Sequence, residues 1–583
     1  MSNYFETNRL TNPVNSKYTK IDLGTAPQSA VNPRKSLFRA LPRLQKQILT
    51  LCVIFGCVIA VTVVVKSLRV SYRTEASVNN SLDESTKPLL GEKYATNSLV
   101  QMELERKFAE QKYVVPKPRT FHFTGPENEQ QREIVAEFKH AWRGYRSKAW
   151  GHDLLKPVSG GHERVYGVGL TILDSLDTLL IMGMHEEFDE AKQWVHSQLS
   201  FDVPQYVNLF ETTIRCLGGL LSAYFLSGGN IFLRKAQDLG DRLVGAFASP
   251  SGIPYSDVEL SSRKAKPPSW HPESSLSEVT TIQLEFRALS RATGNPLYES
   301  LAFNVTKKIH ASTTGCSQPP GLCSMFINPK TGQFSRGTTI TFGARTDSYY
   351  EYLLKQWLQT GKTIDFLRTD YTKAMLSMHK DLYRYSEPSK YAFVGELMRN
   401  KFSPKMDHLV CFLPGTLALG TINGLAPEHM DYAKELAHTC YRMYNTTSSG
   451  LAPEIAHFNM LPTTSDKADI LIKPLDAHSL LRPEAIESWY YLFHLTGDRT
   501  YQRWGWQVFQ SLKRNARVRY GYASVSNVKK VPTVKRDSME SFFLSETMKY
   551  LYLLMSNSSG SSLIPLDRFV FNTEAHPLPI YAN

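Results

Sequence analysis

The chain has 583 residues, of which 42% are hydrophobic and 11% aromatic, and this composition excludes an intrinsically disordered protein. The formal net charge of +13 would suit a nucleic-acid-binding protein, but residues 1–46 carry eight Lys and Arg against two acidic residues, so nearly half of the excess lies in this short segment. We therefore expect no nucleic-acid partner and attribute the basic segment to the membrane region that follows it.

An uncharged segment follows the basic one. Residues 48–65, ILTLCVIFGCVIAVTVVV, would form about 27 Å of helix, enough to cross a thin bilayer. Because basic residues flank mainly its N-terminal side, we expect a single-pass type II signal anchor with a cytosolic tail, 1–47, and a lumenal remainder. A cleaved signal peptide is the alternative, but the preceding segment is long and shows no obvious small-residue cleavage site. The sequence predicts an endoplasmic reticulum or Golgi membrane without deciding between them.

Cysteines and glycosylation motifs fit an oxidising lumen. Outside the predicted span the chain has an odd number of cysteines, so at least one must stay free or pair outside the chain. They are Cys216, Cys316, Cys323, Cys411 and Cys440. Asn-X-Ser/Thr motifs, which also arise by chance, begin at Asn79, Asn304, Asn445 and Asn557.

Beyond a polar stem, 66–125, the rest of the chain, 126–583, shows helical patterns and little strand-like alternation. Glycine-containing dipeptides interrupt these patterns at spacings of 66, 67, 63 and 73 residues. They are Ser227-Gly228, Thr293-Gly294, Thr360-Gly361, Asn423-Gly424 and Thr496-Gly497. Each interval fits a pair of helices, so we predict an all-α domain of about seven helical hairpins curled into a closed α/α toroid.

A polar residue recurs near the start of successive predicted helices, twelve to sixteen residues before each breaker. The members are Glu211, Glu278, Asp347, His408 and Glu484, and Glu546 fits as a further one. If these helices line an inner wall, their N-termini meet at one mouth, where helix dipoles favour negative charge. Several carboxylates around one cavity repel one another and shift their pKa values, an arrangement typical of catalysis or ion binding.

In the segment LLRPEAIESWYYLFHLTGD, the acidic residues could instead serve only to stabilise the start of a helix. Pro483 suits a first helical turn, and Glu484 and Glu487 would interact favourably there with the helix dipole. Arg215 and Arg482 could serve only to neutralise neighbouring acids. The recurrence of polar residues at equivalent helix starts favours a functional site over this purely local role.

These same stretches resemble the class I α-1,2-mannosidases, glycoside hydrolase family 47. The likeness runs from about Glu127 to Ala582, in FKHAWRGYRSKAWGHDLLKP, LDSLDTLLIMG, FETTIRCLGGLLSAY, GARTDSYYEYLLKQW, HLVCFLPGTLALG, LRPEAIESWYYL and VFNTEAHPLPIY. The resemblance implies an α/α toroid of seven hairpins and the Ca²⁺-dependent, inverting removal of terminal α-1,2-linked mannose from high-mannose N-glycans. A role in glycoprotein quality control is likewise an implication of the family.

The resemblance also assigns roles to individual residues. Glu211 matches the general acid, Glu484 the general base, and Asp347 a third catalytic carboxylate, without settling whether Glu211 or Asp347 delivers the proton. Thr573 matches the calcium ligand, through its hydroxyl and carbonyl oxygens. Residues that match the cavity lining and substrate contacts are Arg215, Glu278, Arg345, His408, Arg482, Glu487, Phe542 and Glu546. A structural disulfide is matched by Cys411 and Cys440, leaving Cys216, Cys316 and Cys323 unassigned.

Two alternatives stay open at this point. Arg345 resembles the endoplasmic reticulum members of the family, in which an arginine should favour one branch of the nine-mannose glycan and a single trim to eight mannoses, so a Golgi-type enzyme with broader trimming is the first alternative. A non-hydrolytic mannose-binding lectin of the same fold is the second, opposed by the presence of Glu211, Asp347, Glu484 and Thr573. No zinc-ligand spacing, phosphate loop or Gly-x-Ser-x-Gly elbow indicates another catalytic class. The sequence does not predict an oligomeric state.

Overall fold

The computed structural model describes residues 120–312, 315–317, 319–461, 468–558 and 562–581. The predicted cytosolic tail, the membrane span and nearly all of the predicted stem lie outside these ranges. Within them, no helix combines the length and the apolar character that a membrane crossing requires.

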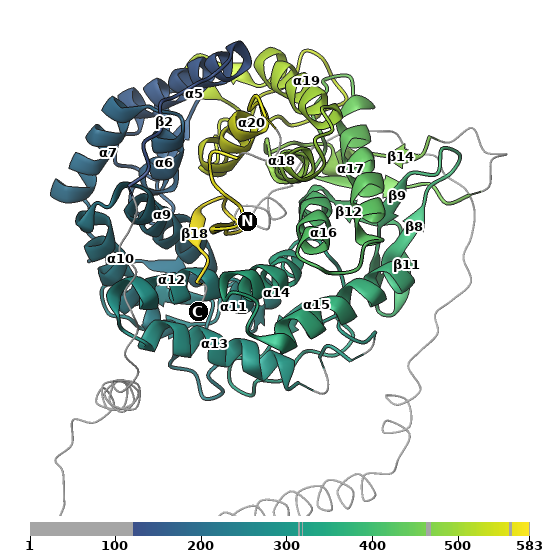
Figure 1. Ribbon diagram of the computed structural model, residues 1–583, viewed down its shortest axis with the longest axis horizontal. Helices are drawn as coiled ribbons and strands as arrows, with labels where there is room; N and C mark the ends of the chain where they lie inside the picture. Colours follow the sequence, from purple (N-terminus) through teal and green to yellow (C-terminus); the bar gives the residue numbers. More distant parts are fainter. Residues whose placement is uncertain (1–119, 313–314, 318, 462–467, 559–561, 582–583) are drawn as a thin grey trace, which may run out of the picture. The chain divides into compact units, whose positions relative to one another are not determined.

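The helices are arranged in two concentric layers around one axis (Figure 1). Seven of those described line the inside: α6 (Leu170–Ile181), α9 (Gly218–Ser227), α12 (Gln283–Thr293), α14 (Asp347–Gln359), α16 (Leu413–Ile422), α18 (Glu484–Thr496) and α20 (Met548–Leu554). The outer layer holds α5 (Glu129–Lys148), α7 (His185–Ser197), α10 (Asn230–Leu243), α13 (Leu297–His310), α15 (Asp365–Ser377), α17 (His429–Asn445) and α19 (Thr500–Asn515). The ring closes where α6 packs against η8 (Phe543–Thr547), the segment that leads into α20. Outer and inner helices alternate along the chain, as the predicted hairpins require.

Burial separates the two layers. Every residue of α6 and of α14 is buried, as expected for helices that are covered on all sides. The outer helix α10 buries one stripe, Phe232, Ala236, Leu239 and Leu243, whose spacing of three or four residues places them on one face. The hydrophobic core therefore runs around the ring, between the layers.

The predicted breakers end five of the inner helices. Gly228, Gly294 and Gly497 directly follow α9, α12 and α18, with φ values of 71°, 75° and 75°. Gly361 and Gly424 follow α14 and α16 one residue later, with φ values of 63° and 92°. Glycine adopts this left-handed conformation without steric cost, which explains why the regular spacing of these dipeptides marks successive helix ends.

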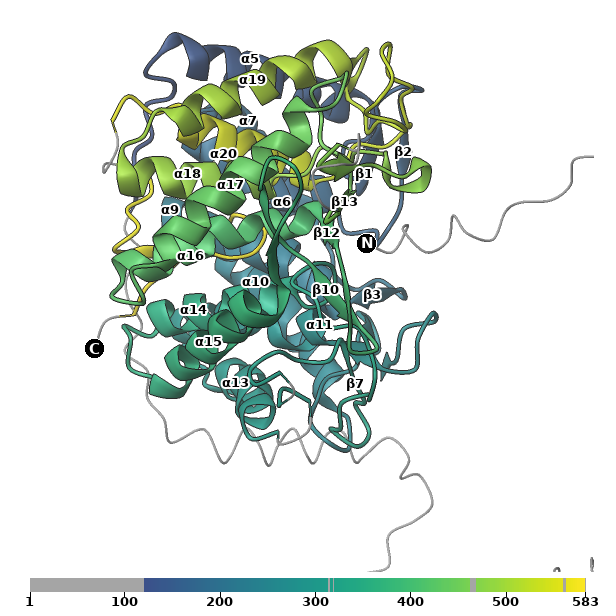
Figure 2. The ribbon, with the colours of Figure 1, turned by 90° about the vertical axis from the view of Figure 1, so that its right-hand side faces the viewer.

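Short antiparallel strands, none longer than four residues among those described, accompany the helices and were not predicted. Two sheets have three strands: β3 (Tyr206–Asn208), β4 (Asp257–Glu259) and β5 (Ala265–Lys266), and β12 (Lys405–Asp407), β13 (Ile455–Phe458) and β14 (Ile470–Leu471). Two-stranded pairs are β1 (Leu154–Lys156) with β2 (Gly161–Glu163), β6 (Ser274–Ser275) with β7 (Phe326–Ile327), β8 (Tyr383–Tyr385) with β9 (Ala392–Val394), β10 (Glu396–Met398) with β11 (Lys401–Ser403), and β15 (Arg517–Val518) with β16 (Gly521–Tyr522). Figure 2 shows that β3, β7, β10 and β12 gather on one side of the ring.

A further hairpin, β17 (Phe569–Phe571) and β18 (Pro577–Pro579), enters the centre of the ring (Figure 1). Its tip is fixed by Asn572, whose side-chain nitrogen donates to the Ile214 carbonyl (2.9 Å) and to Glu285 Oε1 (2.8 Å). On the other side of the tip, His576 lies 3.1 Å from Asp174 and 3.0 Å from Asp177. These contacts pin the tip to three different parts of the inner layer.

Candidate active site

The polar residues predicted at helix starts lie at the N-terminal ends of six inner helices. Asp347 and Glu484 are the first residues of α14 and α18. The others lie in short segments leading into inner helices: Glu211 in α8 (Leu209–Glu211), Glu278 in α11 (Leu276–Thr280), His408 in η6 (His408–Phe412) and Glu546 in η8. Glu211 is followed directly by η3 (Thr212–Leu217). Both η3 and η8 are π-helices, a form often found at functional sites. One end of the inner layer thus carries all these side chains.

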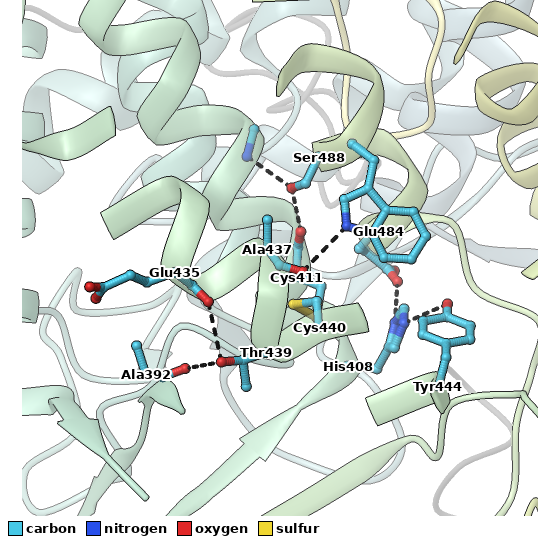
Figure 3. Close-up of a disulfide and its surroundings, with 12 residues drawn as sticks. Ala392, His408, Cys411, Glu435, Ala437, Thr439, Cys440, Tyr444, Glu484 and Ser488 are labelled. Carbon is cyan, nitrogen blue, oxygen red and sulfur yellow. Dashed lines mark hydrogen bonds and ion pairs between the residues drawn. A yellow bond between two sulfur atoms is a disulfide. The ribbon is translucent and has the colours of Figure 1, made fainter. Parts of the chain in front are cut away.

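Contacts from two neighbours orient the Glu484 carboxylate. His408 Nδ1 lies 2.8 Å from Glu484 Oε2, and His408 Nε2 lies 2.8 Å from Tyr444 Oη (Figure 3). His408 thus contacts Glu484 through one ring nitrogen and Tyr444 through the other, and the imidazole tautomer decides which nitrogen donates. A nitrogen of Arg482 lies 3.8 Å from the other oxygen, Oε1. Both oxygens therefore have a defined position at the start of α18.

Two arginines enclose one aromatic ring at this end of the barrel. The guanidinium carbons of Arg215 and Arg482 each lie 5.5 Å from the centre of the Phe542 ring. Arg482 donates to Glu454 Oε2 over 2.6 Å; burial would raise the pKa of Glu454, but this arginine lowers it. Phe542 thus links the part of the site around Glu484 to the part around Glu211.

Arg215 is the centre of a buried ionic group that we call the Arg215 cluster: Asp174, Glu211, Arg215 and Glu574. Its Nε donates to Glu211 over 2.8 Å, Asp174 lies 3.7 Å away, and Glu574 is in direct contact. Burial would raise the pKa of Glu211, but the guanidinium lowers it. The guanidinium therefore favours the ionised form of Glu211.

Asp347 has the opposite environment. Its carboxylate accepts hydrogen bonds from Ser277 Oγ and from the backbone nitrogen of Ser348, both over 2.9 Å. Burial nevertheless raises its pKa to about 7, and the charges of Glu351 and Glu484 add to the effect. Burial therefore favours the protonated form of Asp347 below about pH 7, whereas the pKa of Glu211 is shifted in the opposite direction.

Glu278 and Arg345 lie on the same side of the mouth. Glu278 completes a capping box with Ser275 and also accepts from Asn208 Nδ2 and Ser256 Oγ, both over 2.9 Å. Arg345, with a φ of 78°, stacks on the half-exposed Trp270 ring at 3.8 Å. Burial lowers the pKa of Arg345, while the charges of Glu278, Asp347 and Glu211 oppose that shift. Those three carboxyls are thus within electrostatic reach of one arginine.

The centre of the site holds more carboxylates than cations. Burial raises the pKa of Glu487 to about 8, although Lys355 lies 3.5 Å away. Burial and the charges of Glu574, Glu484 and Glu487 raise the pKa of Glu546 well above its usual range. Mutual repulsion of this kind is what a bound divalent cation relieves.

The tip of the β17–β18 hairpin brings an oxygen donor to these acids. Thr573 precedes Glu574 of the Arg215 cluster, and its backbone nitrogen donates to Tyr352 Oη over 3.3 Å, which leaves its hydroxyl and carbonyl for other partners. Among the described residues, no group of three or more His, Cys, Asp or Glu side chains has a metal-binding arrangement. A hard cation held by one threonine, with waters that bridge to the surrounding carboxylates, fits this donor set.

Residues 137–580 match the family model described as glycosyl hydrolase family 47, which is about three quarters of the chain. The chain belongs to glycosyl hydrolase family 47. It is 53% identical over 456 residues to human endoplasmic reticulum mannosyl-oligosaccharide 1,2-alpha-mannosidase, a match that covers 78% of this chain and 64% of the human protein. A mannosyl-oligosaccharide 1,2-alpha-mannosidase of Candida albicans is 41% identical, with 77% of this chain and 83% of that protein covered. The match therefore spans less than two thirds of the human relative's own length.

Among solved structures, the family 47 ring is similar to that of an alpha-1,2-mannosidase from Trichoderma reesei. The TM-score is 0.73 at 28% identity, and the match covers 78% of this chain and 100% of that one. This likeness confirms the mostly helical, ring-shaped fold for the part of the chain that is described.

A disulfide supports the Glu484 side of this family 47 site. The predicted pair, Cys411 and Cys440, is bonded with a Cα–Cα distance of 5.9 Å, and joins η6, which carries His408, to α17 (Figure 3). Cys316 and Cys323, left open by the sequence, form a second disulfide, and Cys216 is a buried free thiol.

Several ionic partners in the site were not predicted. Glu574 and Asp174 contact Arg215, and Glu454 contacts Arg482, but none of these three acids was singled out in the sequence. Glu574 and Asp174 belong to VFNTEAHPLPIY and LDSLDTLLIMG, two of the stretches that carry the family resemblance. The motifs could therefore have identified these two, whereas Glu454 lies outside them all.

Proposed function

We propose that this family 47 protein is a Ca²⁺-dependent, inverting exo-α-1,2-mannosidase that trims terminal mannose from high-mannose N-glycans. The observation that carries the proposal is that a carboxylate oriented by hydrogen bonding, Glu484, and a deeply buried carboxyl whose pKa is raised to about 7, Asp347, lie at the same end of the inner layer. An inverting glycosidase needs such a pair on separate elements, roughly 6.5–9.5 Å apart, so that a water fits beside the base. The names of the human and Candida relatives supply the substrate class.

Glu484 is assigned as the general base. Its two oxygens are directed by His408 and Arg482, so one face of the carboxylate can take a proton from water while the other stays hydrogen-bonded. Protonation of the leaving oxygen falls to Asp347 or Glu211. Asp347 is favoured for this role, because burial raises its pKa to about 7 in spite of its hydrogen bonds.

Thr573, through its hydroxyl and carbonyl oxygens, would hold the Ca²⁺, and Glu484, Glu487 and Glu546 would hold its waters. When bound, the cation supplies positive charge that orients sugar hydroxyls and the attacking water. The protein itself contributes the excess of carboxylates, whose pKa values are raised by burial and mutual repulsion.

Specificity and location are the finer parts of the proposal. Arg345, stacked on Trp270 beside Asp347, would contact the glycan branches and limit the enzyme to one mannose of the nine. The basic tail and the predicted span would place the catalytic domain in the lumen of the endoplasmic reticulum, or of the Golgi, as a type II membrane protein.

The test is incubation of residues 67–583 with the nine-mannose glycan, with and without a calcium chelator, followed by NMR of the released sugar. We expect the loss of one mannose from a single branch, release as the β-anomer, and no release in the chelator. Broad trimming to five or six mannoses would favour the Golgi-type activity. Glycan binding without release in excess calcium would contradict hydrolysis and favour a lectin.

The pKa values predict the pH dependence of trimming. Because the pKa of Asp347 is raised to about 7, its proton is present below that pH and is lost as the pH rises through it. We expect kcat/KM to fall above about pH 7, and Asp347→Asn to remove this basic limb along with most activity. If Asp347→Asn keeps the limb and Glu211→Gln abolishes it, the proton comes from Glu211 instead.

A further inference from the structure

A second pocket, of about 560 Å³, lies away from the mouth of the barrel. It is bounded by the C-terminal end of α17, the β8–β9 turn, β14 and the loop that contains Lys529. Its polar lining includes Ser389, Tyr391, Arg442, Thr446, Thr447 and Lys529. None of these residues is among those described for the candidate active site.

Arg442 is the unusual group in this pocket. Its Nε is buried and has no hydrogen-bond acceptor in the described structure, and its guanidinium lies over the Tyr391 ring at 5.4 Å. The nearby acid, Asp469, is already occupied by Ser386 Oγ (2.7 Å) and by the nitrogen and hydroxyl of Ser389 (2.9 Å each). This Nε has no acceptor among the described residues, and the arginine lies against an aromatic ring in a hydroxyl-lined pocket. Such a site suits a ligand that offers carbonyl or hydroxyl oxygens and one apolar face.

A glycosylation motif adjoins the pocket at the C-terminal end of α17. Asn445 is the last residue of α17 and is exposed, and the next two residues, Thr446 and Thr447, line the pocket. The other motifs described differ: Asn304 is half-buried within α13, and the exposed Asn557 accepts a hydrogen bond from Asn128 over 3.0 Å. Only at Asn445 does a described Asn-X-Ser/Thr motif adjoin this pocket.

We propose that Asn445 carries an N-linked glycan and that its innermost N-acetylated sugars occupy this pocket. In the transfer, the Asn445 amide nitrogen loses a proton and bonds to the anomeric carbon, while the bond from that carbon to the diphosphate of a lipid-linked oligosaccharide breaks and the diphosphate leaves with the electron pair. The acetamide carbonyl of the sugar then accepts from Arg442 or Lys529, and Tyr391 covers an apolar sugar face. The inference rests on the lumenal location given under Proposed function.

The experiment uses the full chain produced in eukaryotic cells. Occupancy of the four motifs is measured by mass spectrometry after enzymatic release of N-glycans in ¹⁸O-water. Release from Asn445 is then timed in native and in denatured protein, with Asn557 as the internal comparison where it is occupied. We expect Asn445 to be occupied and its glycan to be released at least tenfold more slowly from the native protein than from the denatured one.

Variants test the pocket itself. Arg442→Gln should speed native release from Asn445 at least threefold, whereas Lys530→Gln, beside the pocket-lining Lys529 but not in the lining, should leave it unchanged. Equal rates in native and denatured wild-type protein would overturn the docking, whatever the variants do. If other motifs carry glycans but Asn445 does not, the proposal for Asn445 is wrong and the lumenal location is unaffected. No occupancy at any motif overturns it together with the lumenal location, while mannose trimming by the isolated domain would still test the proposed reaction separately.

Discussion

Glu484→Gln is expected to reduce mannose release by roughly 10²–10⁴-fold, the usual contribution of a general base. The amide keeps the shape of the side chain and can still contact His408 and Arg482, which lie 2.8 and 3.8 Å from the carboxylate, but it cannot take a proton from water. Binding of the nine-mannose glycan should persist. Single-turnover release and equilibrium binding, measured on the same preparation, separate the two effects.

Glu186→Gln is the matched control for this prediction. Glu186 is also an acid in the first turn of a helix, but it lies exposed on the outer helix α7. We expect its replacement to leave mannose release and the midpoint of thermal unfolding unchanged. If both variants lose activity equally, the loss comes from removing any acid in a first helical turn and gives no support to a special role of Glu484. If neither does, Glu484 is not the base.

Arg215→Gln is expected to cost roughly 3–5 kcal/mol of unfolding free energy, because it leaves the three acids of the Arg215 cluster buried without their cation. The cost should depend on pH. With arginine present, the lowered pKa of Glu211 gives a stabilising contribution above its unfolded value that is lost as the pH falls through the folded one. Without Arg215, burial would raise the pKa of Glu211. Its carboxylate would then destabilise the fold at neutral pH, and this destabilisation would be smaller at lower pH, where Glu211 is protonated.

Urea unfolding at pH 7 and pH 5 measures this difference. We expect the difference in unfolding free energy between the wild type and Arg215→Gln to be smaller at pH 5 than at pH 7. Arg146→Gln serves as the control, since Arg146 pairs with Glu190 over 2.8 Å on the surface, where such a pair contributes about 0–1 kcal/mol. A gap for Arg215→Gln no larger than the control's, or one that grows at pH 5, contradicts the assigned role of the cluster.

The ring could be predicted from sequence because its signals are local. Gly228, Gly294 and Gly497 stand where only glycine turns the chain cheaply, and they record the helix ends directly. The polar residues at helix starts, such as Asp347 and Glu484, precede the breakers by twelve to sixteen residues, because one inner helix lies between each pair. Family resemblance supplied the roles, which the geometry alone does not distinguish.

What the sequence did not predict depends on contacts between distant segments. Nothing local to Glu574 reveals that it meets Arg215, because the two are 359 residues apart and meet only when the hairpin enters the ring. The π-helical turns at Glu546 and after Glu211 are shifts in backbone hydrogen bonding that leave no mark in the hydrophobic pattern. The short strands escaped notice since alternation over two to four residues carries little signal.

The position of the β17–β18 hairpin bears on when the proposed activity could first arise during synthesis of the chain. Thr573, the proposed Ca²⁺ ligand, and Glu574 come after all seven described inner helices in the chain. A ribosome must therefore translate past Pro579, and release that segment from its exit tunnel, before the ring can receive its central hairpin. A chain interrupted between α20 and this hairpin, with all seven described inner helices already made, would therefore lack the residue proposed to hold the Ca²⁺.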